Sequence, residues 1–270
     1  MLFSEKQSKD ISLLGAFATL GVGFYSFSQY KTNPGCSCFT YHTDWVRALG
    51  ADFFIRIDGI NIIMVLLTTL LVPFIIQASE GRTIKNPKAY FGLILFMQSA
   101  LLGVFLAKDA LLFYVFWELA LIPIYLICLV WGGEGRQRIT FKFFVFTLSG
   151  SLFMLLAIIY LWLHNPKGSF NLYDFYTVGS HLHPKQQVLV FIAFYVAFAV
   201  KIPIFPLHTW QPDTYVAAPT QGTMMLSGIM LKMGTFALII WLIPIVPTGW
   251  QIASKYVIVL SVIPDNIIVP

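Results

Sequence analysis

Apolar segments of roughly 17 to 25 residues recur along the chain, and they restrict its fold more than any other feature. A helix of this length, rising about 1.5 Å per residue, crosses the roughly 30 Å hydrocarbon layer of a bilayer. Hydrophobic residues form 58% of the 270 positions and charged residues only 11%, whereas a soluble domain carries about 25% charged residues. The sequence therefore predicts an all-α protein, a polytopic transmembrane helical bundle that forms a single membrane domain over residues 1–270.

Seven complete spans and the start of an eighth follow from these segments. Their approximate ranges are 11–28, 60–79, 89–107, 109–131, 141–163, 187–205, 220–246 and, for the eighth, from 252. We expect Pro264 to break the eighth span within Ser261–Asn266, after about a dozen residues, which is too short to cross a bilayer. A truncated or a frame-shifted reading frame is expected to end in this way. No cleavage site follows the first span, which is expected to remain in place as the insertion signal.

Basic residues in short segments between spans predict the orientation of the bundle. Segments 80–88 and 132–142 follow the second and the fourth predicted span, so they lie on the same side of the membrane. We expect this side to be the cytoplasm of a bacterium, with the chain in its inner membrane. Their basic residues are Arg82, Lys85, Lys88, Arg136, Arg138 and Lys142. Segments 29–59 and 164–186 are longer, relatively poor in Lys and Arg, and expected on the opposite side. The net charge of +5 forms no basic face, so nucleic acid is not an expected partner.

The cysteines and loop histidines predict neither a disulfide framework nor a metal site. One loop gathers four potential ligands at a spacing that matches no standard site, namely Cys36, Cys38, His42 and Asp44. Cys128 lies alone in an apolar run, and His181 and His183 are expected to be solvated. Because no phosphate-binding loop, haem motif or redox CxxC is recognisable, no cofactor is expected in this chain.

Glu118 is a carboxylate in the middle of a predicted span. It follows Asp109 by nine residues, which places it roughly 13 Å along a helix. A charge at this depth costs a few kcal/mol, so the side chain is expected to face other helices, water or a partner charge. Two interpretations remain open: a permanently protonated structural residue, or a member of an ion path.

Lys201 lies deep in its span, directly before two prolines. Pro203 and Pro206 each remove a backbone donor, which predicts a helix broken over Lys201–Pro206. Such breaks occur at membrane depth where protein or trapped water satisfies the freed carbonyl groups, as in transporters. Burial favours the neutral amine and a nearby carboxylate favours the ammonium, so moving a carboxylate can switch the proton affinity of the lysine. The alternative is a lysine that extends to an interface.

A second lysine, Lys232, lies about twelve residues after Pro219 and near the middle of its span. Together Glu118, Lys201 and Lys232 supply one acid and two bases, which are the parts of a proton relay or a cation path. His208 extends this path in one interpretation, because histidine exchanges protons near neutral pH. In the other interpretation it is a structural residue that bonds to the broken backbone.

At these residues the chain resembles the antiporter-like subunits of respiratory complex I, the NADH:quinone oxidoreductase, and most closely the branch of subunit M and subunit 4. The resemblance covers about residues 50–260 and is weak over the first fifty. It rests on Asp58–Ile60, Phe116–Pro123, Trp131–Gly133, Phe141–Phe144, Lys201–Pro203, Pro206–Asp213, Ala218–Thr220 and Leu231–Gly234.

The resemblance implies a fold of about fourteen helices in two inverted repeats, of which this chain would hold the N-terminal half. The family's first helix and everything beyond the start of its ninth would be missing. The resemblance places Glu118 on the fifth family helix, Lys201 on the broken seventh with His208 at the break, and Lys232 on the eighth. It implies an electrostatically coupled pair of Glu118 and Lys201, with Lys232 relaying protons along a hydrated axis.

The implied function is proton translocation driven by electron transfer from NADH to quinone in other subunits, which would hold the FMN, iron–sulfur clusters and quinone. Expected partners are the other membrane subunits, especially neighbouring antiporter-like subunits, and the lipid bilayer. One alternative is a subunit of a multisubunit sodium/proton antiporter or of a membrane-bound hydrogenase. Another is a structural fragment without transport. Because one repeat cannot complete the path, independent pumping by this chain is not expected.

Overall fold

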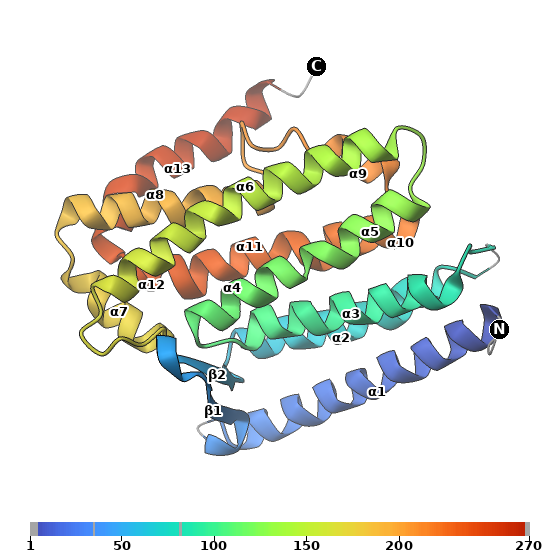
Figure 1. Cartoon of the computed structure of the whole chain (residues 1–270), viewed down its shortest axis with the longest axis horizontal. Helices are drawn as coiled ribbons and strands as arrows, with labels where there is room; N and C mark the ends of the chain where they lie inside the picture. The colour runs from blue at the N-terminus through green and yellow to red at the C-terminus, as the bar shows by residue number, and fades with distance from the viewer. Residues whose placement is uncertain (1–4, 35, 81–82, 268–270) are drawn as a thin grey trace.

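The computed structural model describes residues 5–34, 36–80 and 83–267, which form a bundle of long helices lying side by side (Figure 1). The α-helices are α1 (Glu5–Thr32), α2 (Asn61–Gln77), α3 (Pro87–Leu106), α4 (Ala110–Leu119), α5 (Leu121–Trp131), α6 (Arg136–Leu163), α7 (Leu172–His181), α8 (Pro184–Lys201), α9 (Gln211–Ala217), α10 (Thr220–Met225), α11 (Leu231–Ala237), α12 (Ile243–Ile245) and α13 (Pro247–Ile267). The other elements are strands β1 (Thr40–Val46) and β2 (Ala51–Arg56), 3-10 turns η1 (Ser37–Phe39) and η2 (Arg47–Leu49), and π-helical segments η3 (Leu226–Met230) and η4 (Leu238–Leu242).

The predicted membrane bundle is confirmed. In the described part of the chain, five helical stretches are long and apolar enough to cross a membrane: Lys6–Thr32, Pro87–Leu106, Ala110–Trp131, Arg136–Leu163 and Thr220–Ile245. The shorter apolar helix α2 occupies the second predicted span, and α8 occupies the sixth. The ends differ by a few residues from the predicted ones because several helices continue into polar first and last turns.

The predicted eighth span is wrong in both its start and its break. Helix α13 runs without interruption from Pro247 through the segment Ser261–Asn266. It starts earlier than residue 252 because proline fits the first turn of a helix. In addition, the side-chain oxygen of Gln187 accepts hydrogen bonds from the N–H groups of Thr248 and Gly249, at 3.0 and 3.2 Å. The proline at position 264 lies in the last turn, where its missing N–H does not end the helix.

An antiparallel hairpin of β1 and β2, and the helix α7, lie together at one end of the bundle and were not predicted (Figure 1). The turn between α3 and α4 joins them. There the N–H of Lys108 donates to the Phe54 carbonyl at 2.8 Å, and the Lys108 carbonyl accepts from the N–H of Leu172 at 2.9 Å. Strand β1 is exposed along most of its length, so it lacks the alternating apolar pattern that indicates a strand. We call β1, β2, the turn 107–110 and α7 the hairpin end.

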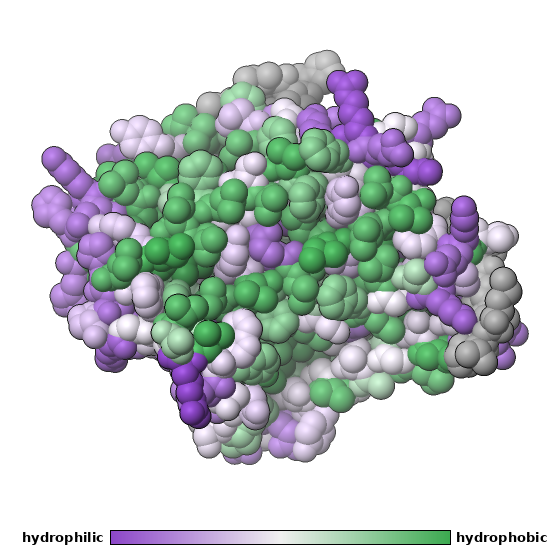
Figure 2. Space-filling view, viewed as in Figure 1, coloured by the Kyte–Doolittle hydropathy of each residue, from purple (hydrophilic) through white to green (hydrophobic). Residues whose placement is uncertain are grey.

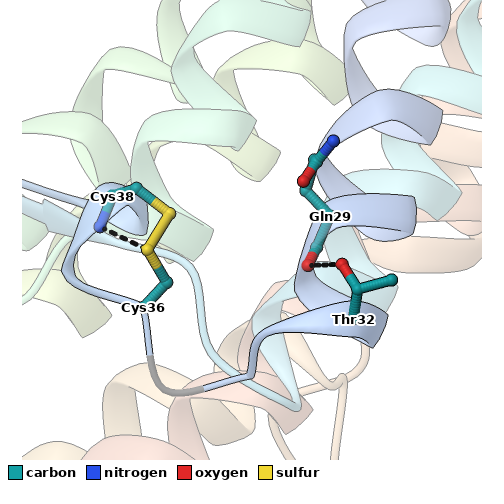
Figure 3. The surroundings of a disulfide bond; sticks show 4 residues. All are labelled: Gln29, Thr32, Cys36 and Cys38. Atoms are coloured by element: carbon teal, nitrogen blue, oxygen red, sulfur yellow. Dashed lines mark hydrogen bonds between the residues drawn. A yellow bond between two sulfur atoms is a disulfide. The ribbon is translucent and has the colours of Figure 1, made fainter.

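The loop after α1 holds a disulfide between Cys36 and Cys38 (Figure 3), which the spacing did not predict. Turn η1, which follows Cys36, brings these two near neighbours together. Their Cα atoms lie 5.2 Å apart, within the usual range of roughly 4.4 to 6.8 Å. The hydroxyl of Thr32 donates to the Gln29 carbonyl at 2.8 Å and closes the last turn of α1.

The histidines at positions 181 and 183, at the end of α7 and before α8, are exposed, as predicted.

The segments rich in basic residues meet at the end opposite the hairpin. Trp131 Nε1 donates to the Lys85 carbonyl at 2.6 Å, which joins segments 80–88 and 132–142. Arg82 lies outside the described residues. Figure 2 shows hydrophilic residues gathered towards the two ends of the molecule, with a mostly hydrophobic surface between them. This distribution is expected of helices that cross a bilayer from one polar surface to the other.

The predicted helix break over Lys201–Pro206 is confirmed. Helix α8 ends at Lys201, and α9 begins only at position 211. The chain itself satisfies the freed carbonyl groups. Trp210 Nε1 donates to the Val200 carbonyl at 3.0 Å, and the N–H of Ile204 donates to the Ala199 carbonyl at 2.9 Å. The break is therefore an ordered turn, which holds the end of α8 in place.

Candidate functional site

Glu118 lies near the end of α4, next to an irregular turn. Helix α4 starts at an N-cap in which the carboxylate of Asp109 accepts the N–H groups of Leu111 and Leu112, both at 3.0 Å. The predicted span 109–131 is one helical stretch in which α4 passes into α5 at Ala120, because Pro123 has no N–H for the carbonyl group four residues earlier. Figure 2 shows a small hydrophilic area within the hydrophobic surface between α4 and α6. Glu118 is half-buried on α4.

Lys201 is the last residue of α8 and is 2% exposed. Its Nζ lies 5.8 Å from the centre of the Trp117 ring, and its ammonium interacts electrostatically with the carboxylate of Glu118. Within the residues that the structure describes, Nζ has no hydrogen-bond partner. The structure therefore places these two ionisable groups in one buried cluster without a direct hydrogen bond to hold the lysine.

Two hydroxyl groups lie beside Glu118 and were not predicted from the sequence as part of the site. Ser151 of α6 is 1% exposed and interacts with both the Glu118 carboxyl group and the Tyr114 hydroxyl. Its own hydroxyl donates to the Leu148 carbonyl at 2.9 Å. Because residues four apart share a helix face, the spacing of Tyr114 and Glu118 could have indicated their proximity. Ser151 lies on a different helix, so nothing local in the sequence could have identified it.

His208 lies beyond the helix break and is half-buried. Its Nδ1 atom is buried and has no hydrogen-bond partner in the described part of the chain. Its ring centre lies 5.7 Å from that of Phe205. A neutral imidazole has one donor and one acceptor nitrogen, so an unpaired nitrogen here is chemically able to take up or release a proton.

Lys232 occupies a different position from the other predicted residues. It is exposed on the surface of this chain, and its Nζ donates to the Ser227 carbonyl at 3.0 Å. The structure thus brings Glu118 and Lys201 together and leaves Lys232 on the outer face of α11. The helix that carries it packs against both α8 and α3.

Buried polar atoms without a hydrogen-bond partner concentrate at the predicted site. Among the described residues they are Trp117 Nε1, Glu118 Oε1, Tyr195 OH, Lys201 Nζ, His208 Nδ1, Tyr215 OH, Gln221 Nε2 and Trp241 Nε1. Half of these atoms belong to the predicted residues or to the tryptophan beside Glu118. Because roughly 90% or more of buried polar groups are paired in proteins, these unpaired atoms single out the region around Glu118 and Lys201.

A second buried lysine lies at the hairpin end. Lys108 is 2% exposed and forms an ion pair with the carboxylate of Asp58. This carboxylate also accepts the N–H of Asn61 at 3.1 Å, and the Asn61 side chain accepts the N–H of Asp58 at 2.6 Å. The neighbouring Asp109 is 1% exposed. Burial raises the pKa of its carboxyl group from 3.8 to about 6, although three backbone hydrogen bonds act in the opposite direction.

Sequence and structure lead to the same group of known proteins. Residues 107–265, more than half of the chain, match the model of the transmembrane family described as NADH:quinone oxidoreductase/Mrp antiporter. The chain belongs to this family. The segment of this chain that matches the NADH:quinone oxidoreductase/Mrp antiporter family contains all four predicted site residues, at positions 118, 201, 208 and 232.

Individual relatives extend this family match to nearly the whole chain. The NADH-quinone oxidoreductase subunit M of Rickettsia conorii is 36% identical over 253 residues, which cover 94% of this chain and 51% of that protein. The F(420)H(2) dehydrogenase subunit M of Methanosarcina mazei is 35% identical over 249 residues, or 90% of this chain and 50% of that protein.

A solved structure of the same family gives the same fold. A chain of the respiratory complex I from Thermus thermophilus with bound NADH is 34% identical, with a TM-score of 0.82. The similarity covers 93% of this chain and 52% of that one. The chain therefore spans about half the length of the relatives it matches.

Proposed function

We propose that this chain forms the N-terminal half of an antiporter-like module in a proton-pumping NADH:quinone oxidoreductase of a bacterial inner membrane. The observation that carries this proposal is the pair formed by the half-buried Glu118 and the buried Lys201. The two interact electrostatically, while the lysine has no hydrogen-bond partner among the described residues. The family and the named relatives support the assignment to this enzyme. Its FMN, iron–sulfur clusters and quinone would be held by other subunits.

The pair can move a proton because each group changes the charge state that the other prefers. A carboxylate close to Lys201 stabilises the ammonium, and separating the two groups in a buried site favours release of the proton. The break after α8 leaves the lysine on a helix end, so a small displacement of that end changes its distance from Glu118. Electron transfer in other subunits would drive this displacement, and the energetic coupling would be reciprocal.

The route beyond the pair uses residues on both sides of the helix break. His208, with its unpaired Nδ1, would exchange protons with the segment after the break. Lys232 would pass protons onward from the outer face of α11, where its exposure allows contact with the remainder of the module or with a neighbouring subunit. The basic segments 80–88 and 132–142 would face the cytoplasm, in agreement with their position at one end of the bundle.

Replacing Lys201 with Met in the complete complex tests the proposal. The rate of proton translocation by membrane vesicles that oxidise NADH is expected to fall by about tenfold, because the switchable ammonium is lost. The matched control is Lys185→Met, an exposed lysine in the first turn of the same helix, which should leave translocation unchanged. Unchanged translocation in Lys201→Met, with normal assembly, would mean that the chain is a structural element.

The same vesicles distinguish the second candidate, a sodium/proton antiporter subunit, which the family description includes. In that case proton movement would depend on an imposed sodium gradient and would not respond to NADH. Loss of sodium-driven exchange in Lys201→Met, without any NADH-driven translocation in the unmodified complex, would favour the antiporter.

A further inference from the structure

Gly234 of α11 lies directly against the end of α8, at a contact too close for any side chain. A Cβ atom at this position would lie 2.8 Å from Ile202 Cγ1, 3.2 Å from Lys201 Cβ and 3.2 Å from the Phe198 carbonyl oxygen. Real Cβ atoms essentially never approach other heavy atoms to less than 3.0 Å. Any larger residue at 234 would therefore push α11 and the last turn of α8 apart.

This contact joins the two helices that carry the predicted lysines. Lys201 is the last residue of α8, and Lys232 lies two residues before Gly234 on α11. Because residues two apart point in different directions on a helix, the glycine can face α8 while Lys232 faces outward. A shift of α11 relative to α8 would therefore change the position of Lys201 with respect to both Glu118 and Lys232.

A second glycine supports the end of α8 from another side. A Cβ at Gly150 of α6 would lie 3.0 Å from Val200 Cγ2 and 3.6 Å from the Ala197 Cα. The last turn of α8 is thus held between α6 and α11, both of which approach through a glycine. Together with the ordered turn that follows, these two contacts constrain where Lys201 lies.

The backbone of α11 is unusual on either side of this contact. The π-helical segment η3 precedes α11 and η4 follows it. Within η4, the Ile240 carbonyl accepts a hydrogen bond from the Tyr176 hydroxyl at 2.6 Å. Wide π turns are rare and occur frequently at functional sites. Here they bracket the single regular segment that carries both Lys232 and the glycine.

We propose that Gly234 is a positioning residue of the proton path, whose missing side chain sets the distance between the end of α8 and α11 and so fixes the position of Lys201. This inference rests on the proposed function, since position matters only if Lys201 exchanges protons. The glycine itself takes no part in proton transfer. Its effect is geometric and should be reversible by removing the atom with which a new Cβ collides.

The test uses the complete complex in membrane vesicles and measures protons translocated per NADH oxidised, together with the amount of assembled complex. Gly234→Ala is expected to assemble normally and to lower this ratio to about half or less, because small displacements of reacting groups strongly reduce transfer. The double variant Gly234→Ala/Ile202→Ala removes Cγ1 and should recover most of the ratio. The matched control is Gly92→Ala on α3, where a Cβ would meet nothing within 4 Å.

Each outcome decides between the alternatives. A wild-type ratio in assembled Gly234→Ala, or a loss that Ile202→Ala does not relieve, would overturn the inference. If Gly234→Ala fails to assemble, the double variant is compared with Ile202→Ala alone: equal ratios support the inference, and a double variant that assembles but pumps far less overturns it. If Lys201→Met also leaves the ratio unchanged, the proposed function itself fails, which separates the two hypotheses.

Discussion

Among the residues that the structure describes, two lysines are buried, and their surroundings differ. Lys108 at the hairpin end and Lys201 at the end of α8 are each 2% exposed. Lys108 is paired directly with Asp58, which is itself held by hydrogen bonds to Asn61. Lys201 interacts with Glu118 only through the electrostatic field, and its Nζ has no hydrogen-bond partner in the described part of the chain.

Under the proposed function, this difference separates a structural charge from one that can be switched. Removing a charge from water costs several kcal/mol, and a direct partner with further hydrogen bonds offsets that cost. The Lys108 pair connects the turn 107–110 to the start of α2, so its charge is permanently compensated. Lys201 has no such direct partner, and in the proposed function a small movement would therefore stabilise either protonation state.

Lys108→Met should cause the largest loss of stability. It leaves the Asp58 carboxylate partly buried without its partner, and breaking a buried pair costs about 3–5 kcal/mol. Thermal unfolding of the complex in detergent would measure the loss, and the double variant Lys108→Met/Asp58→Asn should recover part of it. Proton translocation per assembled complex should remain normal. A loss of translocation without a loss of stability would contradict the structural role of this pair.

Glu118→Gln should reduce proton translocation and leave stability almost unchanged, the opposite of the result expected for Lys108→Met. The amide retains the shape of the side chain but cannot exchange a proton, so translocation is expected to fall by about tenfold, equivalent to about 1.4 kcal/mol, with little change in melting temperature. The control is Glu134→Gln in the exposed segment between α5 and α6. If Glu118→Gln melts much earlier than the unmodified protein yet still pumps, Glu118 is a structural residue like Asp58.

Asp109→Asn addresses the pH dependence of the hairpin end. Because burial raises the pKa of Asp109 to about 6, its contribution to stability is complete below about pH 4 and is lost as the pH rises through 6. Asparagine still caps α4 but does not titrate. The stability difference between the unmodified protein and the variant should therefore change by about 1 kcal/mol between pH 5 and pH 7, in favour of the variant. A difference that is constant with pH would contradict the raised pKa.

Lys142→Ala should have the smallest effect. Lys142 of α6 binds the Thr209 carbonyl at 2.7 Å and the Asp213 carboxylate at 2.9 Å, but both partners of this ion pair are more than a third exposed. Exposed ion pairs contribute about 0–1 kcal/mol and are screened by salt. The melting temperature should decrease slightly at low ionic strength and hardly at all at high ionic strength. A decrease in melting temperature as large as that of Lys108→Met would show that exposure does not distinguish weak ion pairs of lysine from strong ones.

Features that depend on one stretch of sequence were largely predictable. Apolar length predicted the spans, and two prolines three residues apart predicted the break after Lys201. The exceptions are also local. Strand β1 is exposed and has no alternating pattern, and the second proline break, at position 264, was predicted where the helix in fact continues. A proline near a helix end removes too little hydrogen bonding to stop the helix.

Features that depend on contacts between distant residues could not be predicted. Ser151 reaches Glu118 from another helix, and Gly234 touches the turn of Lys201 across a gap of more than thirty residues. The sequence indicated that Lys232 lies at mid-span, but only the packing of α11 decides that it faces outward from this chain. The ion pair of Lys108 could not be predicted, because nothing near it in sequence indicates that Asp58 lies beside it.

The membrane bundle, the broken helix and the small set of ionisable residues within the spans can thus be predicted from the sequence. Helix length, hydrophobicity and proline chemistry act over neighbouring residues, so they can be read directly from the chain. Only the tertiary structure shows that Lys108 pairs directly with Asp58 and that Lys201 Nζ has no hydrogen-bond partner among the described residues. That distinction depends on the distance between charges on different helices, and only the packing of the bundle sets this distance.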